Sequence, residues 1–307
     1  MTKIPLIIST DPGIDDIAAM TISLFAKELD VKMIVPTWGN VTLAYTLQNT
    51  LDLEQFLHTE VPVVKGANQP LVRPAISAAE VHGKTGIAGY KFAKADQSLL
   101  ENGLAATKMY ETIMASSEKV ALLGIGPLTD FALLFKQYPD VVTNIEQVVI
   151  MGANIGRGNH SPFAEYNIAG DPEAAQIVIH SGLPVKVAPL EIGNKAHLTE
   201  DQMARIKACG AVGEMLYAMF ANIHETDGSN QIKIYDPTAV GILLHPEFFT
   251  LKPAQVEIEL AGRVTYGASA IDFNGENKNA EVAVDVDTVK FADWMVESIK
   301  LADQGRK

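Results

Sequence analysis

Cysteine is nearly absent from this chain of 307 residues. Cys209 is the only one, so no disulfide can form within the chain. Proteins of oxidising compartments commonly depend on disulfides, and this sequence therefore favours a cytosolic protein. Cys209 closes a short stretch that resembles the end of a helix, and we expect it to be a packing residue rather than a catalytic thiol.

Basic residues are scarce as well. The chain has 24 Lys and Arg against 37 Asp and Glu, and its formal net charge is −13. Such a balance repels nucleic-acid phosphates and anionic membranes, so we expect no nucleic-acid or membrane partner. A polyanionic substrate would need a local cluster of basic residues, which the sequence lacks. A small neutral substrate fits this charge better.

Long apolar runs are missing too. No stretch approaches the roughly 18 apolar residues that a membrane-spanning helix needs. Residues 1–6 contain only a short apolar run that leads into acidic residues, which is unlike a signal peptide. With 48% hydrophobic and 20% charged residues, the composition is that of a soluble globular enzyme, which we expect to be cytoplasmic.

Short apolar runs alternate with longer segments of helical periodicity. Strands are predicted at residues 5–9, 32–36, 62–65, 120–124, 147–152 and 185–189, and helices at 16–29, 43–58, 99–115, 128–137 and 172–180. This alternation indicates parallel strands joined by crossover helices. We therefore predict an α/β fold with a mostly parallel, Rossmann-like central sheet and helices on both faces.

Three segments interrupt this rhythm. Residues 66–98 are rich in Pro and Gly and are predicted to form a long loop, residues 190–245 are mostly helical, and residues 255–287 are β-rich. No linker or shift in composition separates them from the rest. We therefore predict a single domain over residues 1–307, with a helical insertion and a small β-rich C-terminal part.

Polar residues follow several of the predicted strands. In open parallel sheets, ligands bind beyond the carboxyl ends of the strands. A Gly-rich turn at 124–127 follows the fourth strand, and the first, second and fifth strands are followed by side chains that can coordinate or hydrogen-bond through oxygen: Asp11, Asp15, Asp16, Asn40, Asn154, Asn159, Glu165 and Asn167. We expect these groups to converge at one edge of the sheet.

Three carboxylates within six residues, Asp11, Asp15 and Asp16, would repel one another unless a cation lay among them. Pro12 and Gly13 bend the chain between them, which lets the carboxylates converge. Oxygen donors without a neighbouring His or Cys favour Ca²⁺ or Mg²⁺ over zinc. The alternative is that Asp15 or Asp16 only caps the helix that follows.

Two loops have weaker signals. The turn at 124–126 lacks the third Gly of a dinucleotide-binding fingerprint, but it can aim a backbone carbonyl into the site. Residues 159–167 place amide and carboxylate side chains close together, and such groups can hydrogen-bond the vicinal hydroxyls of a sugar. Asn-rich loops are also commonly no more than turns.

Residues 9–16, Ser-Thr-Asp-Pro-Gly-Ile-Asp-Asp, resemble the N-terminal signature of the inosine-uridine-preferring nucleoside hydrolases. The resemblance covers residues 4 to about 240, and further similar blocks follow in order: Gly39-Asn40-Val41, His82-Gly83, Gly126-Pro127-Leu128-Thr129, Met151-Gly152, Gly158-Asn159, Ala164-Glu165-Tyr166-Asn167, Asp171-Pro172-Glu173-Ala174 and Asp236-Pro237. The first signature is highly specific, and the others are strong only together.

The resemblance implies hydrolysis of the N-glycosidic bond of ribonucleosides by a homodimer or homotetramer. It implies that Ca²⁺ is bound by Asp11, Asp16, Asp236 and the backbone carbonyl of Ile125, together with two ribose hydroxyls, and that the ion holds the attacking water. Asp11 would be the general base. The ribose would be held by Asp15, Asn40, Asn159, Glu165, Asn167 and Asp236. A carboxylate-rich pocket suits an oxocarbenium-like transition state.

The sequence departs from the family at Tyr235. Many members carry a His there that is thought to protonate the leaving base, and a purine-specific branch carries a Trp that stacks on the base. Tyr235 can stack or donate a proton. His82 lies in a His-Gly pair that some members use as a second base-side histidine, and its alternative is a surface-loop residue. We expect His224, at the end of a helical stretch, to be structural.

Two other functions compete with this interpretation. A phosphohydrolase with an aspartate nucleophile after the first strand would need a second Asp two residues later, where this chain has Gly13, and a basic residue for the phosphate. A nucleoside- or ribose-binding protein without catalysis is compatible with the departure at Tyr235. Turnover of any nucleoside excludes that second alternative.

Overall fold

The structure, a computed structural model, describes residues 3–223 and 232–306. In these residues one sheet of ten strands has the order β4-β3-β2-β1-β5-β6-β7-β10-β8-β9. The strands are β1 (Ile4–Thr10), β2 (Leu29–Pro36), β3 (Val63–Val64), β4 (Leu100–Glu101), β5 (Val120–Gly124), β6 (Ile145–Met151), β7 (Val185–Ala188), β8 (Phe249–Ile258), β9 (Ser269–Asp272) and β10 (Ala280–Val286). The strands from β4 to β10 in that order pair in parallel, whereas β8 pairs antiparallel with both β10 and β9.

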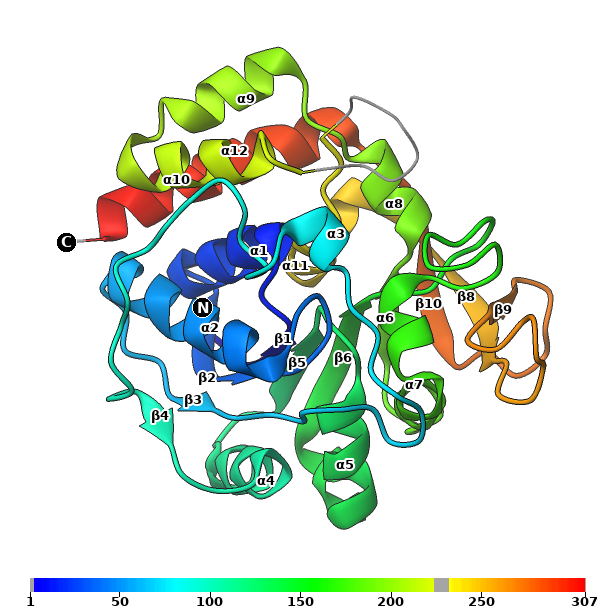
Figure 1. Ribbon diagram of the computed structural model, residues 1–307. Helices are drawn as coiled ribbons and strands as arrows, with labels where there is room; N and C mark the ends of the chain where they lie inside the picture. Colours follow the sequence, from blue (N-terminus) through cyan, green and yellow to red (C-terminus); the bar gives the residue numbers. More distant parts are fainter. Residues whose placement is uncertain (1–2, 224–231, 307) are drawn as a thin grey trace.

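Helices cover both faces of the sheet (Figure 1). They are α1 (Ile14–Phe25), α2 (Leu43–Leu57), α3 (Ala79–His82), α4 (Ala105–Ala115), α5 (Thr129–Gln137), α6 (Tyr166–Gly170), α7 (Pro172–Ile179), α8 (Leu190–Lys195), α9 (Glu200–Lys207), α10 (Gly210–Phe220), α11 (Asp236–Leu244) and α12 (Thr288–Gly305). Short 3₁₀ helices lie at Pro139–Asn144 and Pro246–Phe248. The predicted α/β fold with a mostly parallel sheet is therefore confirmed. Within the described residues, no helix is long and apolar enough to cross a membrane.

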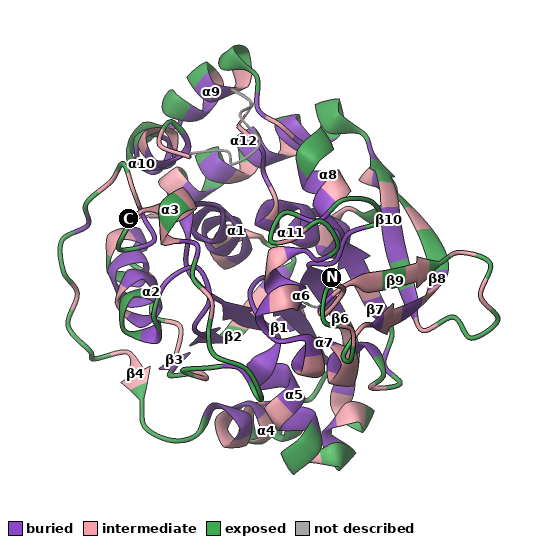
Figure 2. Cartoon of the chain, turned by 45° about the vertical axis from the view of Figure 1, so that its right-hand side comes forward, coloured by how far each residue is buried: buried purple, intermediate pink, exposed green. Residues whose placement is uncertain are grey.

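Two apolar cores lie on opposite faces of the sheet. Leu6 and Ile8 of β1 pack into the core formed with α1, α10, α11 and α12, whereas Ile7 packs into the core formed with α4, α5 and α7. This alternation follows from the two-residue repeat of a strand. The central strands are buried, and exposed residues lie on outward helix faces, on loops and on the edge formed by β8, β9 and β10 (Figure 2). Burial on both faces explains why β1 and β5 are nearly continuous apolar runs.

Two predicted helices had wrong limits, and one helix of the structure was not predicted. The helix predicted at 16–29 begins at Ile14 and ends at Phe25, because Leu29 pairs with Ile4 in the sheet. The start of the helix predicted at 99–115 is strand β4, since Leu100 pairs with Val63. Helix α12 was not predicted, although its packing on α1 and α10 completes one core. In each case pairing or packing with distant residues decides the local structure.

Glu54 is a fully buried carboxyl group on α2, away from the residues that follow the strands. Its Oε2 accepts a hydrogen bond from the Val61 backbone N–H at 3.0 Å, and its Oε1 has no hydrogen-bond partner among the described residues. Burial raises the pKa of Glu54 from 4.5 to about 7. The folded protein therefore binds a proton at Glu54 more tightly than the unfolded chain does.

The Glu54→Gln substitution should remove a pH-dependent loss of stability. Because the folded pKa is raised, the contribution of Glu54 to stability is fully present below about pH 4.5 and is lost as the pH rises through about 7. At pH 8 the variant should be more stable than the unaltered protein by up to about 3 kcal/mol.

Denaturant unfolding at pH 5 and pH 8 measures this difference. Glu60→Gln, at an exposed position on the neighbouring loop, is the matched control and should leave the pH dependence as it was. An equal loss of stability between the two pH values in Glu54→Gln and in the unaltered protein contradicts the prediction.

Candidate active site

The predicted site residues gather where the order of the sheet reverses. Strand β1 lies between β2 and β5, and the chain builds the sheet outward through β2, β3 and β4 before it returns to β5 on the other side. Crevices at such switch points bind ligands in open α/β sheets. The turns after these strands carry Asp11, Asn40 and Ile125, so the residues that the sequence singled out lie together at this edge of the sheet.

Three buried carboxylates form a compact group at this edge. Asp15 and Asp16 lie in the first turn of α1, and Asp236 is the first residue of α11. One ligand atom from each lies within 4.8 Å of those of the other two, and the three side chains are at most 6% exposed. Asp236 is some 220 positions away in the chain, and the packing of α11 against α1 brings it here.

Asp16 performs the capping role that was the alternative for this cluster. Its Oδ2 accepts from the Gly13 N–H at 3.0 Å, and its Oδ1 accepts from the Thr10 hydroxyl at 2.6 Å and from the Asp11 N–H at 3.2 Å. The amide of Asn40 also donates to Oδ2 at 3.2 Å. Asp16 thus caps α1 and faces the carboxylate group at the same time, so capping does not compete with a role in the site.

Asp11 lies directly after β1 and is fully buried. Its Oδ2 accepts from the Asn40 backbone N–H at 2.6 Å, whereas its Oδ1 has no hydrogen-bond partner in the described part of the chain. Gly39 and Gly126 allow this placement, since a Cβ would lie 2.0 Å from Oδ2 at the first and 2.4 Å from Oδ1 at the second. The backbone therefore closes around a carboxylate that keeps one oxygen unused.

The close packing of buried carboxylates raises the pKa of several of them. Burial raises the pKa of Asp11 and of Asp236 well above the usual value, and the neighbouring aspartates raise both further. Burial also raises the pKa of Asp15, against the opposing effect of the His82 ring. A bound cation would remove this penalty and restore the charged forms. The unused Asp11 Oδ1 and the donor set of oxygens alone fit a hard divalent cation.

Tyr166 is a site residue to which the sequence assigned no role. Its phenol donates to the Gly39 carbonyl at 3.0 Å and so fixes the turn that presents Asn40 to Asp11. Burial, followed by the nearby charges of Asp11 and Glu165, raises the pKa of Tyr166 and keeps it a donor. It lies within a block quoted for the family resemblance, which is the only signal that pointed to it.

Glu165 and Asn167 lie at the start of α6, across the site from α1. The Glu165 carboxylate caps α6 by accepting from the N–H groups of Asn167 and Ile168, and it also accepts from Ala153 N–H at 3.1 Å. Burial raises its pKa to about 7. The Asn167 amide donates to the carbonyls of Met151 at 3.2 Å and Ile125 at 3.5 Å, so the Ile125 carbonyl is held at this edge.

His82 is brought to the site rather than left on a surface loop. It is the last residue of α3 and half-buried, and its Nδ1 accepts from the Ile14 N–H at 3.2 Å. The neutral ring therefore carries its proton on Nε2. A Cβ on Gly13 would lie 2.6 Å from Nδ1, so a glycine is required where the ring meets the start of α1.

Two further predicted residues, Asn159 and Tyr235, hydrogen-bond to neighbouring loops and helices. Asn159 is exposed, and its side-chain oxygen accepts from Tyr166 N–H at 2.9 Å, so it holds the loop before α6. The ring of Tyr235 packs on Gly193 of α8, and its phenol donates to Asn194 Oδ1 at 3.1 Å. His224 lies outside the described residues.

The comparisons with known proteins agree with this geometry. The model of the family described as inosine-uridine preferring nucleoside hydrolase matches residues 6–293. The chain belongs to that family. Its relatives include the non-specific ribonucleoside hydrolase RihC of Klebsiella pneumoniae subsp. pneumoniae, 42% identical over 98% of this chain and 99% of the relative, and RihC of Escherichia coli, 39% identical with the same coverage.

Solved structures of nucleoside hydrolases have the same fold as this hydrolase. The purine-preferring ribonucleoside hydrolase from Gardnerella vaginalis is 27% identical with a TM-score of 0.89, and the match covers 98% of this chain and 99% of that one. The plant nucleoside hydrolase PpNRh1 is 25% identical, also with a TM-score of 0.89, over 97% and 99% of the two chains. The predicted activity, hydrolysis of ribonucleosides, is therefore confirmed at the level of the family.

Binding of a divalent cation to this hydrolase should release protons. Burial and the neighbouring carboxylates raise the pKa of Asp11, Asp15 and Asp236, so these groups hold protons more tightly than exposed carboxyls do, and a cation favours their charged forms. The Kd for Ca²⁺ or Mg²⁺ should therefore weaken as the pH falls. Titration calorimetry in two buffers of different ionisation enthalpy measures the protons released.

The Asp236→Asn variant should weaken this Kd at least about tenfold, because it removes one charged donor of the group. Asp201→Asn, at an exposed position on α9, is the matched control and should leave the Kd unchanged. Binding without proton release, or equal affinity in both variants, would show that the cation binds elsewhere.

Proposed function

We propose that this hydrolase cleaves the N-glycosidic bond of ribonucleosides by a calcium-dependent mechanism, with Asp11 as the general base. The products are ribose and the free base. The observation that carries the proposal is the unpartnered, buried Oδ1 of Asp11 beside the group of Asp15, Asp16 and Asp236. A buried carboxylate oxygen that has no hydrogen-bond partner among residues 3–223 and 232–306 is suited to accept the proton of an attacking water.

The calcium ligands would be Asp11, Asp16, Asp236 and the carbonyl of Ile125. Carboxylate and backbone carbonyl oxygens are the ligands that Ca²⁺ takes in proteins. When bound, calcium orients water and the ribose hydroxyls and increases the acidity of the water. These donors are preorganised, because four hydrogen bonds hold Asp16 and the Asn167 amide holds the Ile125 carbonyl.

Asp11 would take the proton of the water through Oδ1. The Asn40 N–H holds the other oxygen, so the carboxylate cannot rotate without losing a bond of 2.6 Å. Burial and the neighbouring aspartates raise the pKa of Asp11 in the cation-free protein, and a bound cation would favour its ionised, basic form. The general base and the metal site therefore depend on one another.

The ribose would be held by Asp15, Asn40, Asn159, Glu165, Asn167 and Asp236. These carboxylates and amides come from both sides of the crevice, from α1 and the β2 turn on one side and from α6 on the other. As the base leaves, positive charge develops on the sugar ring, and preformed carboxylates stabilise it electrostatically. In the proposed complex these carboxylates and amides would replace the water around the sugar.

The leaving base would be activated by His82, with Tyr235 beside it. The Nε2–H of His82 is the free end of a ring whose Nδ1 is held by Ile14, so it is the end that can donate to a base. Tyr235 immediately precedes Asp236, and its ring is supported by Gly193 and its phenol by Asn194. A ring held in this way can form one wall for a stacked base.

The range of substrates, the assembly and the location are also inferred. Relatives at 39–42% identity are named non-specific ribonucleoside hydrolases, so we infer that both purine and pyrimidine ribonucleosides are substrates of this chain. We propose one domain over residues 1–307, since a single sheet joins both ends, and a cytoplasmic homodimer or homotetramer. The net charge of −13 supports the absence of a nucleic-acid or membrane partner.

A panel of purine and pyrimidine nucleosides, assayed for base release with and without Ca²⁺, tests this proposal. Ribonucleosides should be hydrolysed, chelation should abolish the activity, and calcium should restore it. The 2′-deoxy analogues should lose more than about 200-fold in kcat/KM, because the buried polar groups that hold the sugar would be left unpaired. Full activity in metal-free protein would exclude the calcium mechanism, and comparable rates on deoxyribonucleosides would exclude the ribose clamp.

The His82→Ala substitution should lower kcat for natural nucleosides by roughly ten- to a thousandfold, the range of general-acid catalysis. It should have little effect on p-nitrophenyl riboside, whose leaving group needs no proton. Tyr235→Phe should be mild and Tyr235→Ala severe if the ring stacks on the base. A severe Phe variant would make the phenol the donor, and an equal effect of His82→Ala on both substrates would reduce His82 to a positioning role.

A further inference from the structure

The connection between β8 and β9, residues 259–268, is an ordered loop with no role in the function described so far. Its backbone closes on Glu259, whose carboxylate accepts from the N–H groups of Ala261 at 2.7 Å and Gly262 at 2.9 Å. The Glu259 carbonyl accepts from Gly267 N–H at 2.8 Å. These bonds give the loop a fixed shape.

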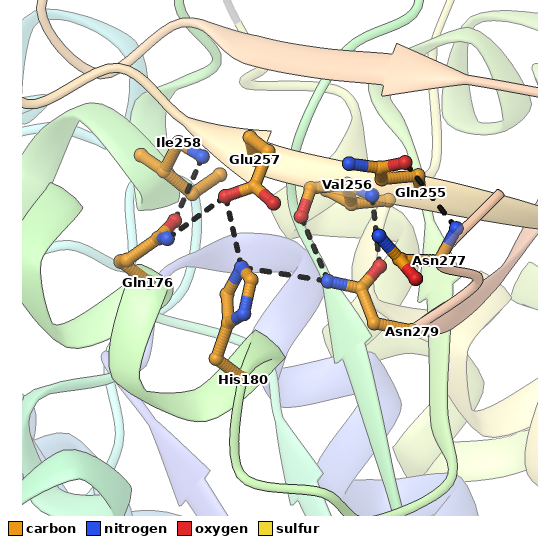
Figure 3. A network of polar contacts seen from close by, with 8 residues as sticks. All are labelled: Gln176, His180, Gln255, Val256, Glu257, Ile258, Asn277 and Asn279. Carbon is orange, nitrogen blue, oxygen red and sulfur yellow. Dashed lines mark hydrogen bonds and ion pairs between the residues drawn. The ribbon is translucent and has the colours of Figure 1, made fainter. Parts of the chain in front are cut away.

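This loop is attached to α7, which follows the ribose-side residues of the site. Gln176 of α7 accepts from Ile258 N–H at 2.8 Å and donates to Glu257 at 3.0 Å, and His180 Nε2 lies 3.0 Å from the same Glu257 oxygen (Figure 3). Asn279 of the β10 side completes the network through Val256 (Figure 3). The end of β8 therefore cannot shift relative to α7 without breaking several bonds.

At its other end the loop packs against the ribose side of the site. Gly267 has a φ of +81°, and a Cβ there would lie 3.1 Å from Ala169 Cα and 3.6 Å from Ala164 Cβ. Ala164 precedes Glu165, and Ala169 follows Asn167 on α6. A glycine is required here by both the conformation and the close approach.

Tyr266 joins this loop to the long loop that carries His82. Its phenol lies 2.6 Å from both carboxylate oxygens of Glu173 in the first turn of α7, and the Arg73 guanidinium carbon lies 3.8 Å from the centre of its ring. We name Arg73, Glu173 and Tyr266 the clasp. Burial, with the adjacent Glu173, raises the pKa of Tyr266 to about 12, which keeps its hydroxyl a donor.

The loop held by the clasp runs from the clasp into the active site. After β3 the chain crosses in front of the sheet to α7 and then turns back to α3 (Figure 1), and Leu71 N–H donates to Asp171 at the start of α7. Further along, Ser77 and Ala78 both donate to the Asn40 carbonyl, at 3.2 and 2.9 Å. His82 ends this path against Ile14.

We propose that Tyr266 and Arg73 are positioning residues that set the 66–82 loop, and through it His82, relative to the ribose side of the site. The inference rests on the role proposed above for His82. The same loop also meets the Asn40 carbonyl through Ser77 and Ala78, so the comparison of two substrates below separates an effect through His82 from an effect on the ribose side. Small displacements of a reacting group far from a substitution can lower rates by up to about a hundredfold.

The experiment compares kcat for a natural ribonucleoside and for p-nitrophenyl riboside in the calcium-loaded enzyme. Arg73→Ala, which removes the cation over the ring, and Tyr266→Ala should reproduce the substrate profile of His82→Ala at a smaller size, with about a tenfold loss on the natural nucleoside. Tyr266→Phe keeps the ring under Arg73 and should lie between these variants and the unaltered enzyme. Glu173→Ala removes the acceptor of the Tyr266 phenol and should lower kcat on the natural nucleoside. Glu173→Gln keeps an acceptor and should have nearly full activity.

The double variant Arg73→Ala/His82→Ala decides whether the clasp acts through His82. It should be no slower than His82→Ala alone, because residues that act through one another are not additive. Arg205→Ala, which removes a surface ion pair with Asp293, is the matched control and should behave as the unaltered enzyme.

Additive losses in the double variant would overturn the proposal. An equal loss on both substrates in Arg73→Ala, but not in His82→Ala, would overturn it as well. If His82→Ala lowers kcat equally for both substrates, His82 is not the proton donor. The positioning role of Arg73 and Tyr266 is then still supported if Arg73→Ala lowers kcat equally for both substrates too. If His82→Ala has no effect on either substrate, the clasp has no residue to act through and is overturned as well.

Discussion

The burial of four carboxylates at one edge of a parallel sheet is the constraint on which the rest of this structure depends. Asp11, Asp15, Asp16 and Asp236 are nearly inaccessible to solvent, and burial together with mutual repulsion raises the pKa of three of them. Such a group is costly in a folded protein unless hydrogen bonds and a cation compensate it. The end of β1 and the turns after β1 and β2 provide hydrogen bonds to Asp11 and Asp16, and glycines at 39 and 126 make room for the Asp11 carboxylate.

The same constraint links stability to chemistry. Asp16 caps α1 and faces the other carboxylates, and Glu165 caps α6 and faces the crevice from the opposite side, so each side chain supports the helix that positions it. Helix N-termini add partial positive charge where the carboxylates are concentrated. A functional carboxylate is thereby held in place by the backbone that it stabilises. Capping a helix and facing the site are therefore compatible roles for one side chain, as Asp16 and Glu165 show.

The residues that we propose for the base side of the site are held in a different way. Its residues lie on loops and on short helices, namely the 66–98 segment with α3, the segment before α11, and α8, and they are held by contacts between distant parts of the chain. His82 is anchored by the N-terminus of α1, Tyr235 by Gly193 and Asn194, and the long loop by Asp130, Asp171 and the clasp. Under the proposed roles, a sugar side on strand ends and helix starts and a base side on loops would allow one reaction to be combined with different base preferences.

The sequence by itself determined the α/β class, most of the strands, the acidic run after β1 and the edge of the sheet where the site lies, because periodicity and turn chemistry act over a few residues. The family resemblance implied that Asp236 joins Asp11 and Asp16, and the tertiary structure shows the packing of α11 on α1 that brings Asp236 to Asp15 and Asp16. Only the tertiary structure decided that Tyr166 fixes the Asn40 turn and that α12 completes one core. These contacts join residues far apart in the chain, and the order of strands and the packing of helices, which no local pattern specifies, bring them together.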